Sequence, residues 1–143
     1  MGPYLSVEDV RLFLVDRGIH DNRNNPLNSD LEFTDKEIDA AMQRAAREYN
    51  SVPPIDIQIN PGRLPNNNNM FLYGVVAQLL ASRVMQLGKE LINYDEGSGS
   101  VSPVRDRLEF YQAKKDEFME QFITLASQQK LTRASNMIFG SVG

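Results

Sequence analysis

The chain contains no cysteine, no tryptophan and a single histidine among its 143 residues. Without cysteine there can be no disulfide, no thiolate metal ligand and no cysteine nucleophile. The opening sequence MGPYLSVEDV has neither the basic nor the apolar segment of a signal peptide, so we expect the protein to be made in the cytoplasm. The central apolar run covers about a dozen residues, fewer than the roughly 20 that cross a bilayer, so no membrane contact is expected.

The chain also has no basic excess. The net charge is −4, with ten acids against six bases in residues 7–49 and nine of each in residues 50–143. A domain that grips DNA normally carries a basic patch, so sequence-specific DNA binding is disfavoured. The hydrophobic content of 41% and the length are typical of one globular domain with a core of its own.

The apolar periodicity predicts an all-α protein, an antiparallel bundle of about four helices around a long central helix. Gln78 is the only strongly polar residue from 70 to 81, so the central helix should be buried on several sides. The predicted helices cover residues 7–17, 34–49, 68–95 and 103–129. The side chains predicted to be buried include Met42, Leu79, Leu80 and Phe118.

Local signals place the starts of the first two helices. Ser6 with Asp9, and Thr34 with Glu37, have the spacing of capping boxes, in which each residue's side chain bonds the other's backbone amide. Gly18 stands where a left-handed cap would end the first helix.

Two segments have no predicted place in the bundle. In the extended arm, residues 53–67, the alternation of Ile55, Ile57 and Ile59 predicts a short strand or an extended segment. No partner strand is evident, so we expect these three isoleucines to lie at a subunit interface. Residues 130–143 follow the predicted domain, residues 1–129, as a C-terminal tail for partner docking.

The residues that could support chemistry form no convincing site. His20 stands beside Asp21, but no nucleophile accompanies them. The loop from Asp21 to Glu32 has the length of a calcium-binding EF-hand loop. However, Arg23 and Pro26 occupy positions that require an oxygen ligand and a glycine. We therefore predict no catalytic residue, no metal site, no cofactor and no enzyme activity.

Two stretches, LSVEDVRLFLVDR and LEFTDKEIDAAMQRAAREYNSVPP, carry a family resemblance. They contain a capped helix with an Asp-Val-Arg core, then Phe-Thr-Asp-x-Glu-Ile, an alanine-rich helix and a Tyr-Asn…Pro-Pro exit. Over roughly residues 5–60 the chain resembles the head–tail connector (adaptor, or head-completion) proteins of tailed bacteriophages. Beyond residue 60 the likeness is in architecture alone.

This resemblance implies a structural virion protein at the neck, made in the host cytoplasm. Such proteins form a ring, often a dodecamer, between the portal and a downstream neck or tail protein, and double-stranded DNA passes through it without specific binding. Their C-terminal segment reaches into the portal. In this chain the portal-binding candidates are Arg133, Met137, Ile138 and Phe139.

A different class, a small intracellular helical regulator that binds protein or DNA, is the alternative. It would need a basic recognition helix, whereas residues 35–49 are nearly neutral.

Overall fold

The computed structural model describes residues 4–16, 33–66, 69–97 and 102–140. Its elements are four helices, α1 (Val7–Asp16), α2 (Asp35–Ser51), α3 (Met70–Gly97) and α4 (Ser102–Gly140). The described residues contain no strand, only an isolated bridge between Tyr4 and Pro65. The predicted all-α class and the order of four helices are therefore confirmed.

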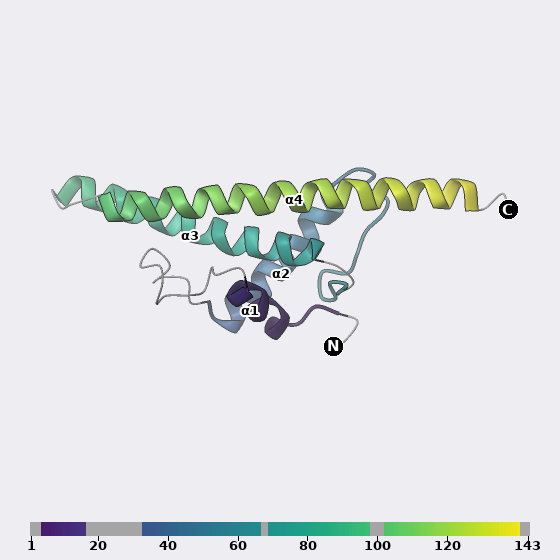
Figure 1. Cartoon of the computed structure of the whole chain (residues 1–143), viewed down its shortest axis with the longest axis horizontal. Coiled ribbons are helices and arrows are strands. Elements are labelled where there is room, and N and C mark those ends of the chain that lie inside the picture. The colour runs from purple at the N-terminus through teal and green to yellow at the C-terminus, as the bar shows by residue number, and fades with distance from the viewer. Residues whose placement is uncertain (1–3, 17–32, 67–68, 98–101, 141–143) are drawn as a thin grey trace.

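Helix α3 is the centre of the bundle. It packs against α4 along one side and against α1 and α2 on the other, and α4 runs antiparallel to it (Figure 1). Leu79, Leu80 and Phe118 are buried as predicted, whereas Met42 is only half-buried at the edge of the core.

The apolar character of α3 extends further than the sequence estimate of about a dozen residues. Within the described residues, Met70–Lys89 is long and apolar enough to cross a membrane by length and composition, with a mean hydropathy of 1.3. More than half of this stretch, 56%, is buried inside the bundle. Packing against three helices accounts for this apolarity, because a core helix passes the same test.

Aromatic rings and one glycine set the spacing between α3 and its neighbours. The Phe71 ring centroid lies 5.2 Å from that of Tyr49 on α2 and 6.1 Å from that of Phe122 on α4. A Cβ atom at Gly74 would lie 2.8 Å from the Phe122 ring. The missing side chain thus lets α4 place a ring directly on the α3 backbone.

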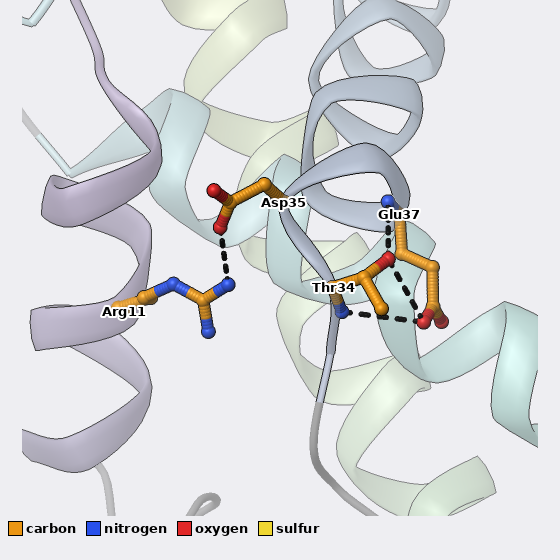
Figure 2. A network of polar contacts seen from close by, with 4 residues as sticks. All are labelled: Arg11, Thr34, Asp35 and Glu37. Atoms are coloured by element: carbon orange, nitrogen blue, oxygen red, sulfur yellow. Dashed lines mark hydrogen bonds and ion pairs between the residues drawn. The ribbon is translucent and has the colours of Figure 1, made fainter.

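Both predicted capping boxes are formed. The Thr34 amide donates to Glu37 Oε1 at 3.2 Å, and the Glu37 amide donates to Thr34 Oγ1 at 3.1 Å (Figure 2). At the start of α1 the Ser6 amide donates to Asp9 Oδ2 at 3.0 Å, and the Asp9 amide donates to Ser6 Oγ at 3.2 Å. The predicted cap at Gly18 lies outside the described residues.

The two stretches that carry the family resemblance meet at the start of α2. Arg11 of α1 forms an ion pair with Asp35, beside the Thr34 cap (Figure 2). The Arg83 guanidinium of α3 lies 4.9 Å from the ring centroid of buried Phe33, and 3.6 Å from the Glu37 carboxylate. These residues therefore join α1, α2 and α3, which is a structural role.

Candidate assembly surfaces

The last helix was predicted to end near residue 129, but α4 continues to Gly140. Residues 129 and 130, which lie within this helix, attach it to α2. The fully buried Lys130 Nζ donates to the Val52 carbonyl oxygen at 2.6 Å and lies 4.6 Å from the Tyr49 ring centroid. The Tyr49 hydroxyl donates to Gln129 Oε1 at 2.6 Å. The segment predicted to be a C-terminal tail is thus helical from its first residue to Gly140, so the predicted end of the last helix near residue 129 is wrong.

Burial perturbs both ionisable groups of this attachment. It lowers the pKa of the Lys130 amine, because a charged amine loses its hydration there. It also raises the pKa of the Tyr49 phenol, an effect that the nearby Arg133 guanidinium partly opposes.

Beyond Lys130 the helix leaves the bundle. Leu131, Thr132, Arg133 and Ser135 are exposed, Leu131 to 63%. The yellow end of α4 extends past the ends of the other three helices (Figure 1). Of the portal-binding candidates, Arg133 lies at the base of this projection. Met137, Ile138 and Phe139 belong to its helical backbone, and their side chains lie outside the described structure.

The predicted subunit-interface residues do not form a strand. Ile59 is half-buried against the core, and the Asn50 side chain forms hydrogen bonds with both backbone groups of Ile59. The Ile59 amide donates to Asn50 Oδ1 at 2.8 Å, and Asn50 Nδ2 donates to the Ile59 carbonyl at 3.1 Å. Ile57 is half-buried, and Ile55 is 61% exposed. The Asn50 side chain thus makes the backbone hydrogen bonds at Ile59 for which a partner strand was expected. Of the three isoleucines, Ile55 alone has a largely exposed side chain.

The later part of the arm returns to the N-terminus, a pairing that the sequence did not reveal. The Leu5 amide donates to the carbonyl of buried Leu64 at 2.7 Å. Next to this contact, Tyr4 is 48% exposed and the Arg63 guanidinium lies 5.7 Å from its ring centroid.

Two surface hollows lie along α4, and Leu125, which is 37% exposed, lines both of them. One hollow has a volume of about 430 Å³, and the other about 330 Å³. The larger is lined by Tyr73, Glu117, Glu120, Gln121, Thr124 and Leu125. The smaller is lined by Met70, Leu125, Gln128, Gln129, Thr132 and Arg133.

The described part of the chain holds no group of three or more His, Asp or Glu side chains placed to bind a metal. His20, Asp21 and the rest of the calcium-like loop to Glu32 lie outside the described residues.

Comparison with protein-family models, curated proteins and solved structures found no match to this chain.

Proposed function

We propose that the chain is a structural virion protein of a tailed bacteriophage. Copies assemble into a ring at the neck, on the path of the double-stranded DNA, between the portal and a downstream neck or tail protein. The resemblance over roughly residues 5–60 supports this proposal. The ion pair between Arg11 and Asp35 joins the two stretches that carry this resemblance.

The observation that carries the proposal is the projecting end of α4. At 1.5 Å per residue, residues 131–140 extend about 15 Å beyond the Lys130 attachment. A helix held firmly at its base and exposed beyond it suits binding in a groove of a partner protein. Arg133, Met137, Ile138 and Phe139 are the residues that we assign to portal contact.

The arm is the second assembly element. Ile55 is exposed, so it is available to a neighbouring subunit, while Ile57 and Ile59 face inward more than expected. Each apolar side chain fully buried by a neighbour contributes about 1.5–3 kcal/mol before ordering costs. Repetition around a ring multiplies such weak contacts through avidity.

The charge distribution also favours this function over a DNA-binding regulator. The exposed side of α2 carries Lys36 and Arg47 together with Asp35 and Asp39, so it has no basic face for a DNA groove. A net charge of −4 suits a passage through which DNA slides without sticking.

The test is the assembly state of the purified chain, alone and mixed with the portal protein encoded in the same genome. We expect native mass spectrometry to show one closed multiple of the 16.2 kDa chain, and electron microscopy to show that ring bound to the portal. A chain that stays monomeric in both samples contradicts the proposal.

Deletion of residues 136–143 tests the portal contact separately, because it keeps Lys130 and Arg133. The melting temperature of the truncated protein should be almost unchanged, while portal binding should be lost. Normal portal binding by the truncated ring would show that the end of α4 is not part of the portal interface. It would not contradict the proposed ring.

A further inference from the structure

An exposed aromatic–arginine pair lies where the N-terminal segment meets the arm. Tyr4 is the only aromatic side chain among the large hydrophobic residues that are exposed in the described structure. The Arg63 guanidinium lies 5.7 Å from the Tyr4 ring centroid, and no described residue forms an ion pair with Arg63. Tyrosine and arginine are enriched in protein–protein interfaces and among the residues that dominate binding energy.

The backbone around this pair is already ordered. The Leu5 amide bonds the Leu64 carbonyl, Leu64 is buried at 1% exposure, and the Arg63 amide bonds the Asn60 carbonyl at 3.0 Å. Little further ordering is therefore needed when the pair is covered, and binding loses less free energy to ordering than a flexible loop would.

The larger hollow on α4 has complementary chemistry. Tyr73 and Leu125 give it an apolar lining, and Glu117 and Glu120 give it negative charge. Glu117 lies 3.6 Å from Lys114 in a solvent-exposed contact, and no described residue forms an ion pair with Glu120. A hollow of about 430 Å³ is the size of a small-ligand site. It therefore has room for the Tyr4 ring together with the Arg63 guanidinium.

Neither Tyr4 nor Arg63 lines the hollow of its own chain, and Tyr4 is 48% exposed. Complementary patches at different places on one subunit produce a head-to-tail contact, which closes into a ring if the rotation permits. We propose that the Tyr4–Arg63 pair of one copy binds in the Glu117–Glu120 hollow of the next copy. This inference rests on the proposed ring and identifies the contact that forms it.

Charge reversal tests the contact. Arg63→Glu should raise the dissociation constant for self-association by about tenfold or more. The reason is that the new carboxylate would face the carboxylates of Glu117 and Glu120 on the next copy. Glu120→Arg should do the same, and the double variant Arg63→Glu with Glu120→Arg should recover most of the lost affinity. The measurement is sedimentation velocity over a range of concentrations, with circular dichroism melting to confirm that each variant is folded.

Arg47→Glu is the matched control, since Arg47 is an exposed arginine on α2 that lies outside the hollow and the arm. It makes the same change of net charge and should leave self-association unchanged. Equal weakening by Arg47→Glu and Arg63→Glu, or no recovery in the double variant, overturns the inference.

The same data separate this inference from the proposed function. If the wild type forms rings and Arg63→Glu forms them equally well, the contact is wrong and the ring stands. If the wild type is a monomer at every concentration, both are wrong.

Discussion

The amine of Lys130 donates a hydrogen bond to the Val52 carbonyl oxygen, at the residue that caps the C-terminus of α2. The last carbonyls of a helix have no partner within the helix and carry partial negative charge, so a cation is favourable there. The Tyr49 ring beside the amine adds a cation–π contact. This arrangement fastens α4 to the end of α2, at the point where the arm begins, and positions the base of the projecting helix.

Replacing this lysine should weaken the fold. We expect Lys130→Ala to lower the free energy of unfolding by about 1.5–3 kcal/mol, the range for a hydrogen bond from a charged group. Lys130→Met should cost less, because the buried stem is retained. Lys89→Ala is the control, since Lys89 is exposed on α3, and it should stay within about 0.5 kcal/mol of wild type in urea denaturation. Equal effects of Lys130→Ala and Lys89→Ala would show that the attachment is unimportant.

The two perturbed groups predict a pH dependence with opposite signs. Burial lowers the pKa of Lys130, so the unfolded chain holds more protons between the folded-state pKa and the ordinary value of 10.5, and stability rises with pH there. Burial raises the pKa of Tyr49, so the unfolded chain loses the phenolic proton first, and stability falls as pH rises above 10.0. The measurement is the free energy of unfolding from urea denaturation at a series of pH values. Its rise with pH should be absent in Lys130→Met, and its fall above pH 10.0 should be smaller in Tyr49→Phe. An unchanged profile in Lys130→Met contradicts the assignment of the rise to Lys130.

The two described glycines inside α3 should respond oppositely to alanine. Alanine favours helix over glycine by about 1 kcal/mol, and at Gly88 no atom outside the neighbouring helix backbone lies within 4 Å of the added carbon. Gly88→Ala should therefore raise the free energy of unfolding by about 0.5–1 kcal/mol. At Gly74 the added carbon would meet the fully buried Phe122 ring at 2.8 Å, and overpacking of about 1–3 kcal/mol should outweigh the helix gain. Thermal melting of the two variants checks both signs, and a stabilised Gly74→Ala variant would show that α4 packs less tightly on α3.

A charge in the centre of α3 should prevent folding. Leu80 is 1% exposed, and an unpaired carboxylate there costs several kcal/mol, so Leu80→Asp should give no soluble, folded protein. Met85→Asp on the same helix is the control, because Met85 is 67% exposed, and it should fold with a loss within about 1 kcal/mol. Expression yield and circular dichroism melting compare the two. A cooperatively melting Leu80→Asp protein means that the assignment of the central helix is wrong.

The helices could be predicted because their signals are local. Apolar residues at helical spacing identify α3, and the capping boxes at Ser6 and Thr34 join residues only three positions apart. The burial of Leu79, Leu80 and Phe118 followed from the same periodicity.

The candidate surfaces were harder to predict. The isoleucine alternation indicated an extended arm, but the pattern could not show that Asn50 would bond both backbone groups of Ile59. The Tyr4–Arg63 pair depends on a contact between the N-terminus and residues about sixty positions later, which no local pattern records.

The sequence by itself determined the all-α class, the order of the helices and the start of each capped helix, because propensity, periodicity and capping act over a few residues. Tertiary structure alone decided which residue attaches α4 to the end of α2. Lys130 resembles an ordinary solvent-exposed residue at a helix end, and it is buried only because the Tyr49 ring and the Val52 carbonyl, 78 positions earlier, meet it in the folded chain. A buried amine is stable only beside such partners, and the fold places them.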